Sequence, residues 1–523
     1  MSLRASILVA GILCGFALVV LRLGDLMLLE HKGLTIRAEG QQNAEQQIDP
    51  LRGMIYDRMG RELAVNIDVV SLFVNPMQID PKAEDRAVSE IVRLTGISYD
   101  EALKKVRSDK GFVWLKRKLP ASFAATVNTK ENPWLGTIAE HQRKYPKGEL
   151  ASHVIGFVGF DNKGVEGIEH RYDKYLTGHA ERVAVARDSG GNTLSDGVDY
   201  QDEGSNVVLT IDEGLQYIAE KQIKKARDTW QAASVSAVMM DPFTGEILAL
   251  ANDPEFDLNA PGKVDPDSRR NRALTDPYEP GSTFKMVTAS TAIEEGVVTP
   301  DTHFDCSRGS ITIGGHTIKD VHRMGYMPVS QIIQKSYNVG TIQIGMKVGK
   351  ERLYKYIKAF GFGTPTGVDI PAESGGSVLP LGNWSQVSLA SSSIGYGISV
   401  TPLQILRAYS AIANGGFLVK PHVVDSVVSQ DGTVKYKFQP EEKKRVISAR
   451  TAATMKQILT SVTEEGGTAT GAAIDGNDVA GKTGTAKLYD TKTHRYSESK
   501  FVGSFVGFVP VSDPKIALIV VVF

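Results

Sequence analysis

The chain is poor in the residues that build disulfide frameworks and metal centres. It has two cysteines in 523 residues, Cys14 and Cys306, and its ten histidines are scattered, with no His-Glu-x-x-His motif and no Cys/His cluster. Cys14 lies in an apolar run, so a disulfide between the two cysteines is not expected. No ligand set of metal-binding spacing is present. We therefore expect a fold held together by its hydrophobic core, with no metal and no cofactor.

The sequence also lacks an excess of charge of either sign. Its 59 Lys and Arg residues nearly balance its 60 Asp and Glu residues, and no basic block stands out. A nucleic-acid partner is therefore not expected. The length is sufficient for two or more domains with a large buried core.

One long apolar run is present, close to the N-terminus. Residues 6–21 carry no charge, and the apolar-leaning residues 23–29 follow Arg22. A helix of this length covers a bilayer core of about 30 Å. No small-x-small cleavage site follows the run, and its all-round apolar character does not suit a soluble helix. We predict a retained membrane anchor within residues 1–33, whose orientation is not settled by the flanking charges Arg4, Arg22, Lys32 and Arg37.

Residues 34–202 form a mixed, polar-rich region in which no nucleophile–base pair stands out. The pattern predicts a strand at 69–74 and amphipathic helices at 81–95 and 98–106, with Asp80 and Ser98 as N-caps. We interpret this region as a scaffold or docking module. Its Arg and Asp pairs, and His153, are expected to be structural rather than catalytic.

Residues 203–523 follow a short polar link and alternate between strand and helix patterns. Asp212 is the expected cap of a helix at 213–227. The strands are expected to form an antiparallel sheet assembled from both ends of this domain, with a helical region inserted between them. The predicted strands are 207–211, 237–240, 246–250, 479–487, 501–509 and 515–523, and the inserted helices are 329–337, 351–359 and 402–414.

A Ser-x-x-Lys motif occurs three times, at Ser282, Ser497 and Ser512. The motif at Ser512 contains a proline in a predicted turn, and the motif at Ser497 lies in a predicted polar loop. Only Ser282 opens an apolar helix, at residues 286–293, so Lys285 is expected on the same helical face. A lysine of lowered pKa can take the proton of such a serine, and the N–H groups of a first helical turn can stabilise an oxyanion. This arrangement suits acyl transfer.

Two further motifs follow in order along the chain. Ser336-Tyr337-Asn338 is predicted to end a helix just before Gly340, where its hydroxyl and amide can point into a cleft. Lys482-Thr483-Gly484-Thr485 is predicted in a strand, where Gly484 leaves room for a substrate backbone and its neighbours can bind a carboxylate. Each triplet alone is weak. The three in this order are a strong signature of the penicillin-recognising serine enzymes.

On these motifs the chain resembles the class B penicillin-binding proteins, and among them the division-specific transpeptidases. The resemblance covers nearly the whole chain, and its further segments are 52–64, 143–167, 241–246, 279–282 and 395–404. It implies an α+β multidomain architecture. A transmembrane anchor (1–33) precedes an elongated α+β pedestal module of the dimerisation type (34–202) and a penicillin-binding transpeptidase domain (203–523). That domain is expected to have a five-stranded antiparallel sheet, flanking helices and an inserted helical subdomain. The family normally continues into a further helix beyond the last strand, so we expect a domain truncated at Phe523, with the sheet edge there in doubt.

The resemblance also implies a role for each motif residue. Ser282 would attack the penultimate D-Ala carbonyl of a D-Ala-D-Ala stem peptide, with Lys285 as general base. Ser336 would relay the proton to the leaving amine, tuned by Lys482, and Asn338 would hold the peptide amide. Thr483 and Thr485, with Gly484 between them, would bind the terminal carboxylate, and the N–H groups of Ser282 and Thr485 would form the oxyanion hole. An acceptor amine would then resolve the ester, and β-lactams would acylate Ser282.

The implied setting is the cytoplasmic membrane, crossed once, with the bulk of the chain on the outer, periplasmic side. The implied partners are donor and acceptor stem peptides, β-lactams, a membrane-embedded SEDS-type glycan polymerase and other division proteins. Three alternatives stay open. They are a sibling transpeptidase of elongation or sporulation, a serine β-lactamase, and a catalytically silent membrane-anchored scaffold or β-lactam sensor. The β-lactamase has no deacylating glutamate that we can place, and intact Ser282, Lys285, Ser336 and Lys482 argue against the silent scaffold.

Overall fold

The computed structural model describes residues 3–29, 43–48, 50–178, 181–186, 203–440, 443–490 and 495–523. The chain divides into two compact units. The first comprises residues 1–51 and 178–204, and the second comprises residues 52–177 and 205–523.

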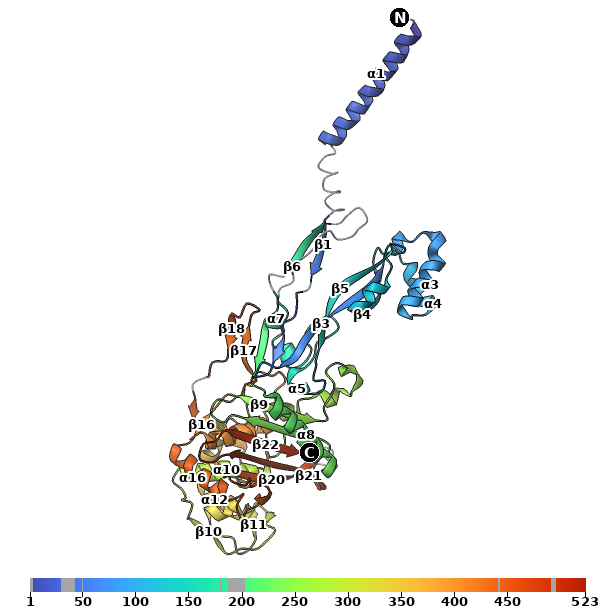
Figure 1. Ribbon diagram of the computed structural model, residues 1–523. Coiled ribbons are helices and arrows are strands. Elements are labelled where there is room, and N and C mark those ends of the chain that lie inside the picture. Colours follow the sequence, from blue (N-terminus) through green and yellow to red (C-terminus); the bar gives the residue numbers. More distant parts are fainter. Residues whose placement is uncertain are drawn as a thin grey trace. The chain divides into compact units, whose positions relative to one another are not determined.

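The first unit contains the predicted apolar helix. Helix α1 (Leu3–Gly24) continues into a π-helical turn at Asp25–Leu29 (Figure 1). Within it, Ile7–Met27 has a mean hydropathy of 2.4, is unburied, and is long and apolar enough to cross a membrane. The same unit has a two-stranded antiparallel ribbon of β1 (Asn43–Ile48) and β6 (Glu181–Ala186).

The second unit begins with a three-stranded antiparallel sheet covered on one face by two helices. Strand β3 (Glu62–Val74) pairs with β4 (Val113–Pro120) and β5 (Leu135–Lys144). Helices α3 (Glu84–Thr95) and α4 (Tyr99–Val106) pack on it through one apolar cluster. Both predicted caps are confirmed, because Asp80 accepts a hydrogen bond from the Lys82 N–H at 2.8 Å and Ser98 accepts one from the Glu101 N–H at 3.2 Å.

Strand β7 (Asn206–Leu209) joins this sheet and not the catalytic one. It pairs in parallel with β2 (Ile55–Tyr56) and antiparallel with β17 (Val424–Val428), in the order β18-β17-β7-β2-β3-β4, where β18 is Val434–Lys437. Strands from both sides of the predicted boundary at 202/203 therefore share one sheet. A Cβ atom on Gly53 would lie 1.9 Å from the carbonyl oxygen of Ser205, so only glycine allows this close backbone approach.

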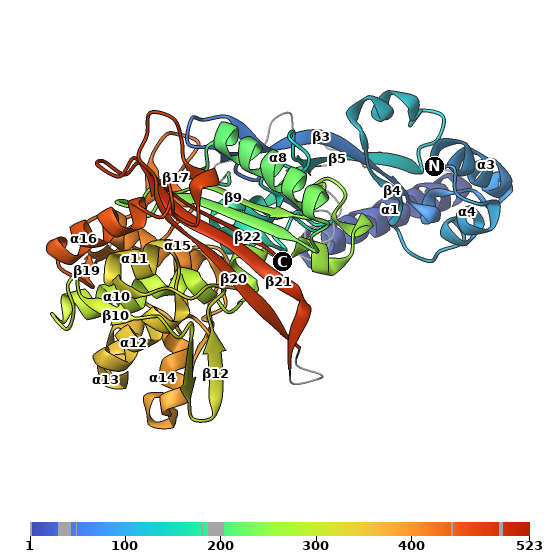
Figure 2. The same cartoon turned by 90° about the horizontal axis from the view of Figure 1, so that it is seen from below.

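The predicted five-stranded antiparallel sheet is confirmed, in the order β20-β21-β22-β8-β9. Its strands come from both ends of the domain: β8 (Val235–Met240), β9 (Ile247–Asp253), β20 (Ala480–Asp490), β21 (Arg495–Val509) and β22 (Ile516–Val522). Figure 2 shows α8 (Glu213–Trp230) on one face of this sheet, with α10 (Lys285–Glu294) and α15 (Pro402–Ala413) on the other.

Two predictions about this sheet are wrong. Strand β22 is not a sheet edge, because β21 and β8 pair with it on either side. Ser497, predicted in a loop, lies in β21, whose pairing with β20 extends to Arg495 opposite Asp490. The prediction for Asp212 is confirmed, since its carboxylate accepts the N–H groups of Gly214 and Leu215 at the start of α8.

The inserted helical region packs around one central helix, α10 (Lys285–Glu294), most of whose side chains are buried. Burial on all sides explains why polar residues do not gather on one face of this helix, whose Thr288, Ser290 and Thr291 are buried as well. The predicted helices correspond to α11 (Val329–Gln334), α13 (Lys350–Ala359) and α15 (Pro402–Ala413). Helices α12 (Asn338–Val348), α14 (Gln386–Ser393) and α16 (Ala449–Thr460) complete the region.

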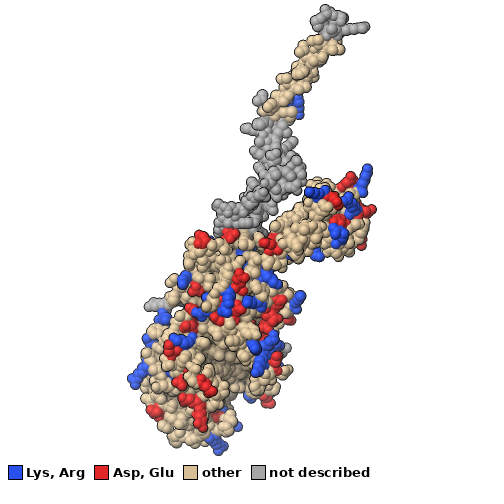
Figure 3. Space-filling view, viewed as in Figure 1, with Lys and Arg blue, Asp and Glu red and all other residues tan. Residues whose placement is uncertain are grey.

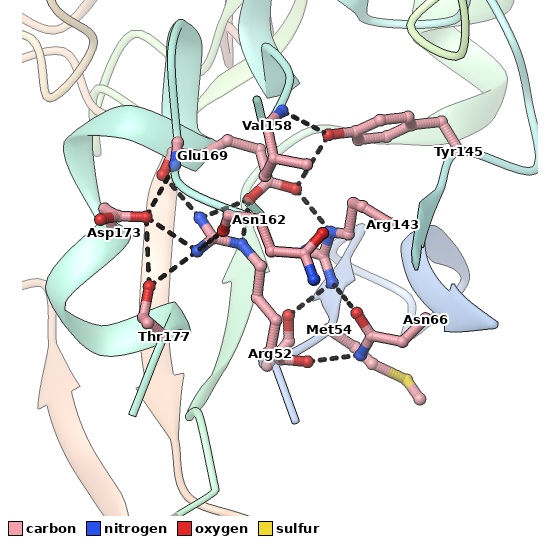
Figure 4. A network of polar contacts seen from close by, with 12 residues as sticks. Arg52, Met54, Asn66, Arg143, Tyr145, Val158, Asn162, Glu169, Asp173 and Thr177 are labelled. Carbon is pink, nitrogen blue, oxygen red and sulfur yellow. Dashed lines mark hydrogen bonds and ion pairs between the residues drawn. The ribbon is translucent and has the colours of Figure 1, made fainter. Parts of the chain in front are cut away.

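A buried ion network lies at the base of the three-stranded sheet (Figure 4). Glu169 is fully buried and accepts from Arg52 Nε at 2.7 Å and from Arg143 Nε at 2.6 Å, while Arg52 also pairs with Asp173 at 2.7 Å. These charges satisfy one another, as predicted for structural pairs. His153 is likewise structural, since its Nε2 lies 2.9 Å from the Ser268 carbonyl oxygen and burial lowers its pKa to about 4.

The exposed charges of the second unit are mixed. Figure 3 shows Lys and Arg side chains interspersed with Asp and Glu on the face in view. This distribution agrees with the balanced composition.

Candidate active site

Ser282 lies in a tight turn that leads directly into α10. Residues Gly281–Phe284 form a single 3-10 turn, η7, and Lys285 is the first residue of the helix, so the predicted placement of both residues is confirmed. Gly281 has a φ of +53°, which favours glycine, and its N–H donates to the Gly395 carbonyl at 3.1 Å. The buried Tyr409 hydroxyl donates to the Thr283 carbonyl at 2.8 Å. The turn is thus held from two sides.

Strand β20 packs directly against this turn. A Cβ atom on Gly484 would lie 2.9 Å from Thr283 Cγ2, 3.0 Å from the Pro280 carbonyl oxygen and 2.5 Å from Ser504 Oγ. Residue 484 must therefore be a glycine, because the Ser282 turn comes so close to β20 at this position. This differs from the reason inferred from the sequence, which was room for a substrate backbone.

The side chain of Lys285 joins the first two motifs. It is fully buried, and its Nζ donates to the Ser336 carbonyl at 2.6 Å, to Asn338 Oδ1 at 2.7 Å and to Ser336 Oγ at 3.4 Å. In the part of the chain that the structure describes, Lys285 Nζ makes no hydrogen bond to Ser282. Ser282 itself is half-buried.

Ser336, Tyr337 and Asn338 link α11 to α12. Ser336 has a φ of +60°, a strained value for a residue other than glycine, and Asn338 begins α12. The prediction that a helix ends just before Gly340 is therefore wrong, because Gly340 lies inside a helix. A Cβ atom there would lie 2.7 Å from Ile332 Cδ1, so glycine permits α12 to pack closely on α11.

The two motif lysines have strongly lowered pKa values. Burial lowers the pKa of Lys285 well below the usual value, and the nearby Lys482 cation lowers it further, while Asp320 acts in the opposite direction. Burial lowers the pKa of Lys482 to about 7. A buried lysine without its proton is a competent general base, and perturbed pKa values of this kind cluster at functional sites.

Thr483 and Thr485 lie on β20, at one edge of the five-stranded sheet. Thr485 is exposed, and Thr483 Oγ1 donates to Thr468 Oγ1 at 3.2 Å. An edge strand offers unpaired backbone groups to which an extended peptide can bind. Both hydroxyls are therefore placed where a peptide can approach.

Two residues near the motifs were missed by the sequence analysis. Asp320 accepts the backbone N–H groups of Asn338 at 2.6 Å and Val339 at 2.9 Å. Glu279 accepts the Gly397 N–H at 2.8 Å and the Tyr496 hydroxyl at 3.1 Å. Glu279 belongs to one of the segments that carried the resemblance. Asp320 belongs to none, and no sequence pattern marks it.

In the residues that the structure describes, no group of three or more His, Cys, Asp or Glu side chains could hold a metal ion.

Comparison with known proteins identifies two domains in the chain. The Penicillin binding protein transpeptidase domain matches residues 235–522, and the Penicillin-binding Protein dimerisation domain matches residues 47–209. The chain is 32% identical to the peptidoglycan D,D-transpeptidase FtsI of Escherichia coli K12, covering all of this chain and 87% of that protein. It is 33% identical to stage V sporulation protein D of Bacillus subtilis, and the match covers 97% of this chain and 79% of that protein.

Among solved structures, penicillin-binding protein 3 of Mycobacterium tuberculosis, complexed with aztreonam, is similar with a TM-score of 0.70 and 30% identity. The match covers 91% of this chain and 90% of that one. The matched domains span most of the chain and include all three motifs. The chain therefore belongs to the class B penicillin-binding proteins, a family of serine-type peptidoglycan D,D-transpeptidases.

Proposed function

We propose that this protein cross-links peptidoglycan stem peptides through an acyl-enzyme on Ser282, during septal wall synthesis. The observation that carries the proposal is the meeting of the buried Lys285 amine with Ser336 and Asn338, at the start of the helix that follows the Ser282 turn. The site residues act as follows.

In the first step, Ser282 Oγ attacks the carbonyl carbon of the penultimate D-Ala of a donor stem peptide. Neutral Lys285 takes the hydroxyl proton as the carbon–oxygen bond forms, and the N–H groups of Ser282 and Thr485 stabilise the oxyanion. Lys285 Nζ bonds to Ser336 and Asn338 here, and catalytic hydrogen bonds such as the one from Ser282 to Lys285 often form only when substrate is bound.

In the second step, the carbon–nitrogen bond breaks and the terminal D-Ala leaves. Ser336 relays a proton to the leaving amine, and Lys482 adjusts this relay through its charge. Thr483 and Thr485, with Gly484 between them, bind the terminal carboxylate before it departs, and Asn338 holds the peptide amide. An acceptor amine then attacks the ester carbonyl carbon and loses a proton to Lys285. The bond between that carbon and Ser282 Oγ breaks, and Lys285 returns the proton to Ser282 Oγ as the cross-link forms. β-Lactams acylate Ser282 in the same way.

The pedestal and anchor support a wall-synthesis enzyme over a free β-lactamase. We assign residues 1–33 to the cytoplasmic tip and the anchor, 34–202 to the pedestal and 203–523 to the transpeptidase domain. The substrate lies outside the cytoplasmic membrane, so the body is placed on the periplasmic side. Residues 6–29 and 52–60 are the proposed contact with a membrane-embedded SEDS-type glycan polymerase and other division proteins. Exchange of the anchor for an unrelated helix should abolish co-purification with that polymerase, and unchanged co-purification would exclude the contact.

The septal role is the finer part of the proposal, and the relatives carry both division and sporulation names. Depletion of the protein distinguishes the roles by cell shape. Filaments are expected for septal synthesis, whereas round cells would indicate elongation, and a defect confined to spores would indicate sporulation.

Labelling with a fluorescent penicillin tests the enzyme assignment. The parent chain should be labelled covalently, and Ser282→Ala should abolish the label. The matched control is Ser512→Ala, which removes the serine of another Ser-x-x-Lys motif and should leave labelling unchanged. Labelling that persists in Ser282→Ala would exclude Ser282 as the nucleophile.

A further inference from the structure

Helix α12 carries Asn338 at its first position, yet its N-cap residue Tyr337 provides no side-chain hydrogen bond. The first N–H groups of a helix need partners from elsewhere, and an anion is favoured there by the helix dipole. The partner is remote in sequence. Asp320, directly after β12 (His316–Lys319), accepts the N–H of Asn338 at 2.6 Å and that of Val339 at 2.9 Å.

The same short segment also orients the Asn338 side chain. Asn338 Nδ2 donates to the Lys319 carbonyl at 3.4 Å, which leaves Oδ1 facing Lys285 Nζ at 2.7 Å. Tyr337, between the two motif residues, donates its hydroxyl to the His322 carbonyl at 3.2 Å. Residues 319–322 therefore hold the motif through its main chain and its side chains.

We propose that Asp320 is a positioning residue for the acylation step. Its carboxylate fixes the start of α12 so that Ser336 and Asn338 remain within hydrogen-bond distance of Lys285 Nζ. Among the described residues Asp320 makes no hydrogen bond to Ser282, and it is assigned no contact with the substrate. The inference rests on the proposed function, because it assigns Asp320 a part in the activation of that serine.

Asp320 also acts on Lys285 through its charge. Two charged groups face Lys285. The Lys482 cation on β20 lowers the pKa of Lys285, and the Asp320 carboxylate raises it. Three further titratable groups lie on the Asp320 side, namely Cys306, Asp305 and Tyr337. The negative charge of Asp320 favours the protonated form of Lys285. Its removal therefore lets Lys285 lose its proton at a lower pH.

The test measures penicillin acylation rates from acid to alkaline pH with the full chain in detergent, for the parent, Asp320→Asn, Asp320→Glu and the exposed control Asp301→Asn. Asp320→Asn should lower the optimal rate by about tenfold, as expected for a lost hydrogen bond to a charged group. It should also shift the acid limb of the profile to lower pH. Asp320→Glu keeps the charge but not the geometry, so its rate should fall with the acid limb unmoved. Asp301→Asn should behave as the parent.

A parental rate and profile in Asp320→Asn would overturn the inference while leaving Ser282 labelling, and so the proposed function, intact. If Asp320→Asn loses rate but the acid limb of its pH profile stays in place, Asp320 is only a structural cap of α12, and this result too would overturn the inference. If Asp320→Asn fails to fold, the acylation rate of Asp320→Glu becomes the test, because a parental rate in that variant excludes a positioning role. Failure of the parent to label would instead reject the proposed function.

Discussion

Thr283, the residue after the proposed nucleophile, lies so close to β20 that a Cβ atom on Gly484 would be 2.9 Å from its Cγ2. The Lys-Thr-Gly motif on β20 thus packs directly against the Ser282 turn, and this packing is independent of any contact with substrate. The Ser282 turn can reach its position only because β20 has no side chain at residue 484.

The substitution Gly484→Ala should therefore push the Ser282 turn away from β20. A misplacement of about 1 Å can cost on the order of 100-fold in rate, and we expect an acylation loss of this size. The measurement is the penicillin acylation rate, with the melting temperature as a check on folding. Gly503→Ala is the matched control, because Gly503 pairs with Thr485 across the sheet and its Cβ would meet open space. Equal rates for the two variants would contradict the packing argument.

The charge of Lys482 should be visible in the pH profile of acylation. Burial lowers the pKa of Lys285 first, and the Lys482 cation lowers it further, so Lys482→Met should raise the pKa of Lys285. Lys285 acts as a base only when neutral, and the acid limb of the profile should therefore move to higher pH. Stopped-flow acylation across a pH series measures the shift. The exposed Lys515→Met should leave the limb in place, and a limb that moves to lower pH in Lys482→Met would contradict the coupling.

The buried Glu169 should contribute strongly to the stability of the pedestal. It pairs with Arg52 and Arg143, and the side chains of all three residues are almost fully buried. Glu169→Gln leaves the buried Arg143 guanidinium without a carboxylate partner and leaves Arg52 with Asp173 alone. Breaking a buried pair in this way typically costs about 3–5 kcal/mol in the free energy of unfolding. Urea unfolding measures the change. The control Glu101→Gln breaks an exposed pair with Lys105 and should cost less than about 1 kcal/mol. A similarly small loss for Glu169→Gln would contradict the expected burial cost.

The parts of the fold that were predictable from the sequence are those specified by local chemistry. Short apolar runs on either side of the turn at 241–245 predicted β8 and β9, and Asp212 marked the start of α8. The three motifs predicted which side chains would meet, and the structure brings Lys285, Ser336 and Asn338 together.

Other features depend on distant contacts and leave little local signal. Helix α12 contains glycines and β-branched residues of low helix propensity, and its packing on α11 overrides that preference. Strand β7 looks like any buried strand, and only the close approach of Gly53 to Ser205 decides its partner. Asp320 is a single aspartate in a loop, whose role comes from a helix 18 residues away in the chain.

Asp57 should stabilise the junction between the pedestal and α8 in a pH-dependent way. Its buried carboxylate accepts the N–H groups of Met59 and Arg61 at 2.8 Å and that of Glu213, the first residue of α8, at 3.2 Å. Burial alone would raise the pKa of Asp57, but these N–H groups and the Arg61 charge lower it overall. The stabilisation is therefore present above the unfolded pKa of about 3.9 and is lost as the pH falls through the lower folded value.

The substitution Asp57→Asn tests this sign directly. At pH 7 it should lower the free energy of unfolding by about 1–3 kcal/mol, because an N–H group loses its charged partner. The difference from the parent should shrink as the pH falls below the folded pKa, where Asp57 itself becomes neutral. Urea unfolding at several pH values measures both effects, with Asp68→Asn as the control, since the Asp68 side chain is 82% exposed. A difference of constant size across the pH range would show that shape, and not the charge of Asp57, holds the junction.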